Sequence, residues 1–458
     1  AWLLARPVTA PEATAYMTFG TQSLLGILTD YSLPSNHVLH TLLMKISTSI
    51  FGLSTWSMRL PAFLAGVLAL PLFYLLARTL FNRYIAMMAL ALCAASPQLI
   101  ELSVLALGYS ISWVAMLTAM LLARHLVREN NILTALFMGI VLALGMWSVP
   151  SMIYCAITVF LWVLFTLLGK YQRSLSERTT LLGLSALVFI LATLLLYLPV
   201  VIEHGVDMLF HHVSEGERTW AGFAGTYADR VIDFWIWMAD PSYDWVLFLG
   251  FAALFHATYI SGKFRALAFA LLLGSVPLSI GVMSAGNPWQ WTYTIFFFHL
   301  STSIGLFYLL TLIPERVFKS LCKRTRTGWA AAGLVVLTAS GLGVSLRRLA
   351  HLGESRASAS MLMQTLQPND RLCFDARWET AVSFELLAQG MERERLQALL
   401  TPQGNLPPGS TLWVAIGRRG GPSPTEALVR CGYEAEGFEP PVLQKNWERF
   451  EIFAARKR

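Results

Sequence analysis

Residues 60–81 of this 458-residue chain read LPAFLAGVLALPLFYLLARTLF, in which Arg78 is the only charged residue. About 20 consecutive apolar residues are enough for a helix to cross the hydrocarbon layer of a membrane. Helices are favoured there because lipid offers the backbone no hydrogen-bond partners, and only helices or closed barrels satisfy the backbone internally. Residues 180–202 and 295–313 form similar apolar blocks, and none of the three alternates in polarity as barrel strands do. The sequence therefore predicts an all-α polytopic membrane bundle.

The composition extends this interpretation to most of the chain. Apolar residues make up 55% and charged residues 13%, whereas soluble domains usually contain ~25% charged residues. Dividing the chain at its polar connectors predicts about ten spans. They lie at 60–81, 84–102, 109–126, 132–148, 150–169, 180–202, 244–261, 264–284, 293–313 and 329–346.

The formal net charge of +7 follows the order of these spans. Alternate connectors contain basic residues, near 78–83, 124–128, 170–178, 263–265 and 316–326, whereas the turns at 103–108, 149 and 285–292 contain none. Cytoplasmic loops of membrane proteins are enriched in Lys and Arg, so the basic connectors are expected in the cytoplasm. The positive charge is thus a topology signal, and no nucleic-acid partner is expected.

This topology divides the chain into three regions. Residues 1–59 are too polar to span and are expected to form a first outer loop. Residues 60–346 form the bundle, interrupted by a large outer loop at 203–243, and residues 347–458 form a soluble outer α/β domain. In that domain the pattern predicts strands at 371–375, 411–416 and 450–454, with helices at 377–389 and 425–431. A further span, either a signal segment or a structural helix, is expected before Ala1.

Cysteine and histidine spacing predicts no metal site. Cys373 and Cys431 both fall in the outer domain, where oxidation can occur, and the sequence leaves a disulfide and two free thiols open. The pair His37 and His40, and the histidine-containing loop that begins at residue 203, lack further ligands at suitable spacing.

Ionisable residues concentrate at the outer ends of the spans. Glu12, Asp30 and Arg59 lie in the first loop, Glu101 ends a span, and Glu203 begins the large loop. Charge at one membrane face is typical of an interfacial enzyme, whereas a transporter needs polar groups near the midplane. A transporter or lipid flippase remains an alternative.

Two ordered runs in the first loop narrow the enzyme class. Residues 30–43 read DYSLPSNHVLHTLL, and residues 51–61 read FGLSTWSMRLP at the entry to the next apolar block. An acidic loop, an Asn-His helix start and a Phe-Gly to Arg-Leu-Pro entry resemble bacterial GT-C glycosyltransferases of family 39, related to protein mannosyltransferases and aminoarabinose transferases. The resemblance covers about residues 6–115 and implies a GT-C-like helical bundle.

The resemblance also implies a reaction. A hexose or pentose would pass from a polyprenyl-phosphate carrier to a glycan, lipid or protein acceptor at the outer face of the bacterial plasma (inner) membrane. This chemistry needs a carboxylate base for the acceptor hydroxyl, donors for the departing phosphate and an apolar groove for the lipid. Beyond the lipid-linked donor no cofactor is implied, and the sugar, the acceptor and any need for a divalent metal stay open.

Carried over residue by residue, the resemblance makes Glu12 the candidate base. Glu12 matches the second carboxylate of the acidic pair that begins the family's first loop, but Pro11 stands where the family usually has Asp. The alternative for Glu12 is a solvated loop glutamate. Arg59 is a candidate phosphate partner or an anchor at the membrane interface. A substrate-orienting role, or else an ordinary helix start, is predicted for Asn36, His37 and His40.

A second departure lies near residue 107. Where the family reads Ala-Arg-Gly-Tyr-Ser, this chain has Leu107 in place of the Arg, which removes one expected cation. Tyr109 is a candidate contact for phosphate or sugar, or else part of an interfacial aromatic belt. In the large loop, Arg218 is a candidate phosphate or acceptor contact. The departures at Pro11 and Leu107 motivate a further alternative, a catalytically silent relative that binds lipid-linked sugar or scaffolds an envelope complex.

Overall fold

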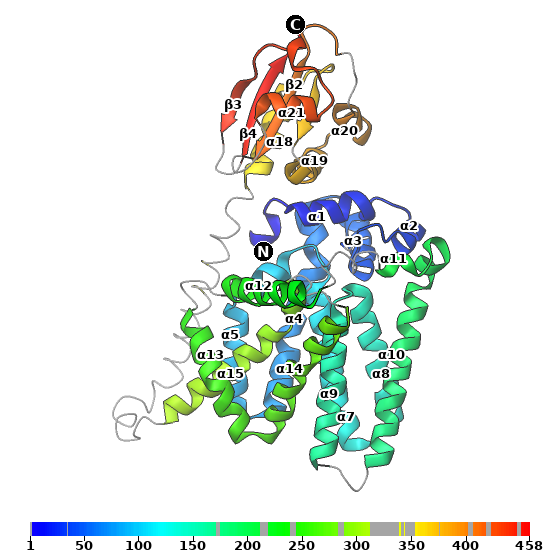
Figure 1. Cartoon of the computed structure of the whole chain (residues 1–458), viewed down its shortest axis with the longest axis vertical. Coiled ribbons are helices and arrows are strands. Elements are labelled where there is room, and N and C mark those ends of the chain that lie inside the picture. Colours follow the sequence, from blue (N-terminus) through cyan, green and yellow to red (C-terminus); the bar gives the residue numbers. More distant parts are fainter. Residues whose placement is uncertain are drawn as a thin grey trace. The chain divides into compact units, whose positions relative to one another are not determined.

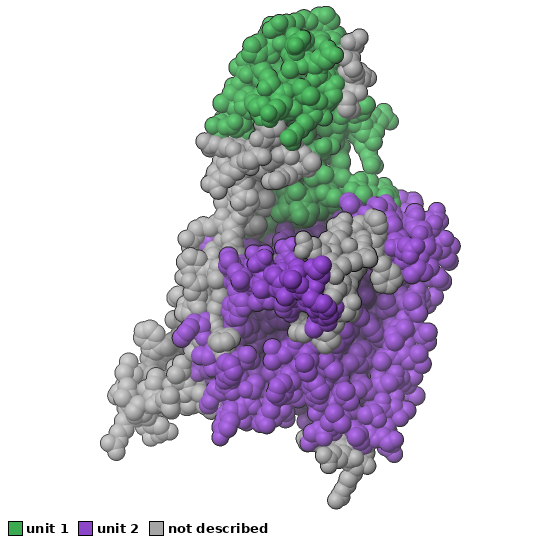
Figure 2. All heavy atoms as spheres, viewed as in Figure 1, with its two compact units in different colours: residues 1–22, 44–60, 347–458 green, residues 23–43, 61–346 purple. Residues whose placement is uncertain are grey.

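A computed structural model describes residues 2–33, 35–170, 175–210, 219–238, 244–282, 288–311, 353–374, 376–401, 406–417, 423–446 and 450–458, together with Ala339 and Gly343. The chain divides into two compact units, which Figure 2 colours separately. Unit 1 comprises residues 1–22, 44–60 and 347–458. Unit 2 comprises residues 23–43 and 61–346.

Long apolar helices form the bundle, and several run side by side in Figure 1. Asn side chains mark some of their ends, because Asn82 and Asn131 cap the N-termini of α5 and α8. Asn130 ends α7 in the left-handed conformation, with φ 51°. The helices are α4 (Thr55–Leu80), α5 (Arg83–Ala95), α6 (Pro97–Val104), α7 (Tyr109–Glu129), α8 (Ile132–Ser148), α9 (Met152–Lys170), α10 (Leu175–His204), α11 (Asp207–Phe210), α12 (Trp220–Met238), α13 (Asp244–Ile260), α14 (Gly262–Val282) and α15 (Thr294–Thr311).

Four helices of the described residues, α4, α7, α9 and α10, are individually long and apolar enough to cross a membrane. The span expected at 84–102 is instead divided into α5 and α6, which are bent by 60°. The expected single span is thus corrected to two helices. Pro97 explains the bend, because the residue that precedes a proline, here Ser96, disfavours helical backbone. The span expected at 329–346 lies outside the described residues except for Ala339 and Gly343.

The core of the bundle is apolar and closely packed. Side chains from α4, α5, α7, α8, α9, α14 and α15 share one buried cluster that includes Phe73, Trp113 and Phe296. Gly139 allows α8 to approach α10, since a Cβ atom at this position would lie 2.6 Å from the carbonyl oxygen of Ser185. Close backbone contact through small residues is a usual feature of membrane helix packing.

The two predicted outer loops contain helices of their own. In the first loop these are η1 (Trp2–Ala5), α1 (Ala10–Thr14), the π-helical η2 (Ala15–Gly20), α2 (Leu24–Thr29) and α3 (Val38–Phe51). The stretch 203–243, predicted as a large loop, contains α12, which runs crosswise to α7–α10 in Figure 1. Exposed Trp220, Ile232 and Ile236 show that α12 has apolar side chains on its surface.

The soluble α/β domain lies in unit 1 and is built around a four-stranded sheet of order β1-β2-β4-β3. Strand β1 (Arg371–Phe374) pairs in parallel with β2 (Thr411–Gly417), whereas β4 (Phe450–Arg456) runs antiparallel to β2 and to β3 (Val442–Asn446). The three predicted strands are confirmed, and β3 is additional. All five β3 residues are exposed, so the strand lacks the alternation that would reveal it.

Helices flank this sheet, and one disulfide joins a strand to a helix end. They are α18 (Gly353–Thr365), α19 (Ala376–Ala388), α20 (Arg393–Leu400) and α21 (Pro424–Arg430), of which α18 and α20 were not predicted. Cys373 on β1 and Cys431 after α21 form a disulfide, which decides the alternative that the sequence left open.

Candidate functional site

The seven predicted site residues fall into three groups. Glu12 and Arg59 lie in unit 1, and Asn36, His37, His40 and Tyr109 lie in unit 2. Arg218 is outside the described residues.

Glu12 and Arg59 form a buried, bidentate ion pair. Arg59 Nε donates to Glu12 Oε1 at 2.7 Å, and Arg59 Nη2 donates to Glu12 Oε2 at 2.8 Å. The Arg59 side chain is 2% exposed and that of Glu12 is 0% exposed. Thr9 completes the surroundings of the carboxylate, because its backbone N–H and its hydroxyl donate to Glu12 Oε2 at 2.8 and 3.0 Å. This parallel pairing is among the strongest hydrogen-bonded geometries in proteins.

The remaining donors of Arg59 bind backbone carbonyl oxygens of the first loop. Nη1 donates to residues 3, 4 and 6, at 3.2, 3.3 and 2.7 Å, and Nη2 donates to Pro7 at 2.9 Å. In this arrangement all three guanidinium nitrogens of Arg59 donate to protein oxygens, and both Glu12 oxygens accept hydrogen bonds. A base must contact the acceptor hydroxyl. The geometry therefore fits a role in holding the first loop better than direct contact with phosphate or acceptor.

Asn36 shapes the turn that precedes α3. Its Nδ2 donates to the carbonyl oxygens of Ile27 and Asp30 at 3.0 and 2.6 Å, and its Oδ1 accepts from the hydroxyl of Thr41 at 3.2 Å. The side chain is 1% exposed. Asn36 thus fixes the backbone that presents the next residue, His37.

His37 is held as a neutral imidazole. Its Nδ1 accepts the backbone N–H of Gly108 at 2.9 Å, which requires Nδ1 to be unprotonated and places the ring proton on Nε2. Burial lowers the pKa of His37 to about 4. Among the described residues none accepts the Nε2–H, so this group remains available as a hydrogen-bond donor.

His37 lies at one end of a row of packed aromatic rings. The rings of His37 and Tyr109 meet edge to face with centroids 5.4 Å apart, and Tyr109 meets Trp289 in the same way at 5.9 Å. Of the predicted residues, the structure therefore brings together Asn36, His37 and Tyr109. His40 is also buried, at 1% exposure, on the first turn of α3.

The turn at residues 105–108 fixes this cluster from the bundle side. The hydroxyl of Ser148 donates to the carbonyl oxygen of Gly108 at 2.8 Å, and a Cβ atom on Gly108 would collide with the Ser148 carbonyl oxygen. Leu107 is 3% exposed and belongs to the apolar core of the bundle. The Gly108 amide was not predicted as a site group, because a backbone donor leaves no residue-type signal in a sequence.

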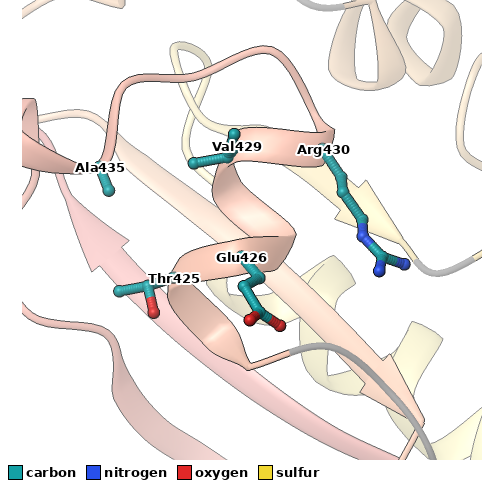
Figure 3. Close-up of a pocket in the computed structure, with 5 residues that line it drawn as sticks. All are labelled: Thr425, Glu426, Val429, Arg430 and Ala435. Atoms are coloured by element: carbon teal, nitrogen blue, oxygen red, sulfur yellow. The ribbon is translucent and has the colours of Figure 1, made fainter.

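An open pocket on the soluble domain is lined by Thr425, Glu426, Val429, Arg430 and Ala435, mostly on α21 (Figure 3). The carboxylate of Glu426 accepts the Ser423 N–H at 2.9 Å to cap this helix, so the pocket offers little unused chemistry. Within the described ranges, no three His, Cys, Asp or Glu side chains gather in a way that could hold a metal ion.

The helical bundle and the soluble domain together have the fold of GT-C membrane glycosyltransferases. Residues 36–197 match the family model for dolichyl-phosphate-mannose-protein mannosyltransferase, which confirms the family resemblance from residue 36 onward. A crystal structure of apo ArnT from Cupriavidus metallidurans is similar, with a TM-score of 0.60, 14% identity, and coverage of 99% of this chain and 94% of ArnT. ArnT bound to undecaprenyl phosphate gives a TM-score of 0.58, 14% identity, and coverage of 99% and 95%. No curated protein matches the sequence.

Proposed function

We propose that this chain transfers a sugar from a polyprenyl-phosphate carrier to an acceptor at the outer face of a bacterial plasma membrane. Two comparisons support the proposal. The fold matches that of ArnT over nearly the whole chain, and one ArnT structure contains undecaprenyl phosphate. The family model for dolichyl-phosphate-mannose mannosyltransferases matches residues that include Asn36, His37 and Tyr109.

The observation that carries the proposal is the fixed tautomer of His37. In the transfer, the bond from the anomeric carbon to the phosphate oxygen breaks, and the acceptor oxygen forms the new bond. Negative charge then grows on the departing phosphate, where a preorganised donor is most effective. The Nε2–H of His37 has the character of such a donor, because the Gly108 amide holds the opposite ring nitrogen. Tyr109 adds a phenol beside it.

Glu12 has two possible roles in this proposal. As the general base, it would take the proton of the acceptor hydroxyl in a form of the first loop in which Arg59 has released one of its oxygens. As a positioning residue, it would stay bound to Arg59, as observed. The observed pairing favours the second role, and a Glu12→Gln variant separates the two. Loss of a base typically costs 10²–10⁴-fold in rate without loss of the folded loop, whereas loss of positioning disorders the loop as well.

The soluble domain is proposed to lie outside the cytoplasm. The Cys373–Cys431 disulfide supports this placement, since disulfides persist in oxidising compartments. Labelling of single cysteines introduced at exposed positions Lys445 and Arg128 tests it. The label should reach position 445 from outside intact cells and position 128 only after permeabilisation, and the reverse pattern would refute the topology.

Transfer of a labelled sugar in proteoliposomes that contain polyprenyl-phosphate donor tests the reaction. His37→Ala should lower kcat by at least tenfold, because a donor to the departing phosphate acts mainly in the transition state. His125→Ala, which removes an exposed histidine from α7, is the matched control and should change kcat by less than twofold. Equal rates for both variants would remove His37 from the site.

One observation favours the catalytically silent alternative. Leu107 stands where the resemblance leads one to expect Arg, and it is buried in the bundle core, so this position supplies no cation. Tight binding of polyprenyl phosphate by the wild-type chain, without transfer to any of a panel of lipid, glycan and peptide acceptors, would favour this alternative over the enzyme.

A further inference from the structure

Residues 3–9, here called the clamped segment, are bound by two pairs of oppositely charged side chains. The first pair is Glu12 and Arg59. The second is Glu385 on α19 and Arg356 on α18, in which Arg356 Nε donates to Glu385 Oε2 at 3.0 Å. Both pairs lie within unit 1, although more than 290 residues separate Arg59 from Arg356 in the sequence.

The second pair binds the backbone groups that the first pair leaves. Arg356 Nη1 donates to the carbonyl oxygen of Ala5 at 2.9 Å, and the N–H of Val8 donates to Glu385 Oε1 at 3.3 Å. Arg59 takes the carbonyl oxygens of residues 3, 4, 6 and 7. Along the clamped segment, hydrogen bonds therefore alternate between Arg59 and the soluble domain.

The burial of Glu385 shows that this contact is built into the domain. The Glu385 side chain is 2% exposed, and a buried carboxylate is unfavourable unless charged or polar partners compensate it. One of its two oxygens finds its partner in the first loop, at Val8. Its other oxygen accepts from Arg356 inside the domain, so this one carboxylate links the domain to the clamped segment.

Apolar and polar contacts extend the same interface along the first loop. Tyr16 meets Phe384 edge to face with ring centroids 5.7 Å apart, and Met17 packs against the buried core of the domain. Arg393 Nη2 on α20 donates to the hydroxyl of Thr21 at 3.1 Å. The soluble domain thus contacts the first loop from Ala5 to Thr21.

We infer that Arg356 and Glu385 are positioning residues of the transferase, which hold the first loop in the conformation in which Glu12 binds Arg59. The soluble domain accordingly supports the conformation of the first loop. The role in transfer rests on the proposed function, whereas the clamping of the segment stands independently of it.

Limited proteolysis of the full-length protein in detergent tests the clamp. Glu385→Leu should raise the rate of cleavage within residues 1–22 by tenfold or more, because hydrogen bonds to charged groups are lost and the segment opens more often. Glu385→Gln retains a carbonyl oxygen that can accept from Val8, so the rate should rise less. Glu379→Leu, on the same helix, is the matched control and should stay within twofold of the wild type.

The transfer assay tests positioning with a milder variant. Arg356 is 40% exposed, so Arg356→Met should leave the domain folded by circular dichroism while it releases Ala5. A positioning role predicts at least a fivefold lower kcat with the KM for the lipid donor within twofold, and partial recovery in Arg356→Lys. Unchanged cleavage in both Glu385→Leu and Arg356→Met, with the domain folded, would overturn the inference. Should the wild type itself show no transfer, the proposed function fails, and the cleavage rates still decide whether the clamp exists.

Discussion

Replacement of Arg59 by Leu should release the N-terminal part of the first loop. Arg59 makes two hydrogen bonds to Glu12 and four to backbone carbonyl oxygens. The variant leaves Glu12, which is 0% exposed, as a buried carboxylate without its cation. Breaking a buried ion pair from one side costs about 3–5 kcal/mol. Because each 1.4 kcal/mol is a factor of ten, local opening should become at least ~100-fold more frequent.

Cleavage of native protein by a dilute protease measures this opening, provided that the segment recloses faster than it is cut. Arg59→Leu should be cut within residues 1–22 about 100 times faster than the wild type. Arg230→Leu is the control, because the Arg230–Asp233 pair is 44% and 54% exposed, and such pairs contribute about 0–1 kcal/mol. A rise of less than about threefold for Arg59→Leu would refute the reasoning.

The double variant Glu12→Leu/Arg59→Leu separates the ion pair from the backbone contacts. Removing both charges abolishes the buried unpaired carboxylate, so cleavage should slow relative to Arg59→Leu. It should not return to the wild-type rate, because the four carbonyl oxygens still lack their donor. Full recovery would show that these four bonds contribute nothing to holding the loop.

Three further outcomes are expected. The pKa of His37 falls from 6.5 in the unfolded chain to about 4 in the folded protein, so the free energy of unfolding should be at its full value above pH 6.5 and fall by up to about 3 kcal/mol as the pH drops to 4. Thermal unfolding of His37→Gln should lack this pH dependence, and an identical pH dependence in the variant would contradict the assignment. Gly108→Ala places a Cβ atom against Ser148, so it should lower the free energy of unfolding by about 1–3 kcal/mol and weaken binding of polyprenyl phosphate. An unchanged melting temperature and unchanged binding would argue against a fixed turn. Reduction of the Cys373–Cys431 disulfide, which closes a separation of 58 residues, should lower the unfolding free energy of the soluble domain by about 2–4 kcal/mol in denaturant titrations; the doubly Ser-substituted chain should then be insensitive to reductant.

The sequence predicted the fold where local composition decides it. The apolar run at residues 60–81 became most of α4, since a helix in lipid needs no partner outside itself. The break at Ser96 was missed although Pro97 signals it, because the hydrophobicity continues unchanged through the bend. Strand β3 was missed because its residues are all exposed, and pairing with β4 supplies its structure.

The sequence predicted which residues are candidates for the site, but not which residues bind one another. The candidates Glu12 and Arg59 were chosen separately, and nothing in a separation of 47 residues shows that they bind each other. The same holds for His37, whose tautomer depends on a backbone amide 71 residues away. Contacts between distant segments arise from tertiary packing, and a single sequence contains no local pattern for them.

The burial of Leu107 affects how this chain can be engineered or can evolve. An arginine at this one position would insert a guanidinium among the apolar side chains of the bundle, which proteins tolerate only with a compensating anion. A cation at position 107 would therefore require coordinated changes in the side chains that surround it.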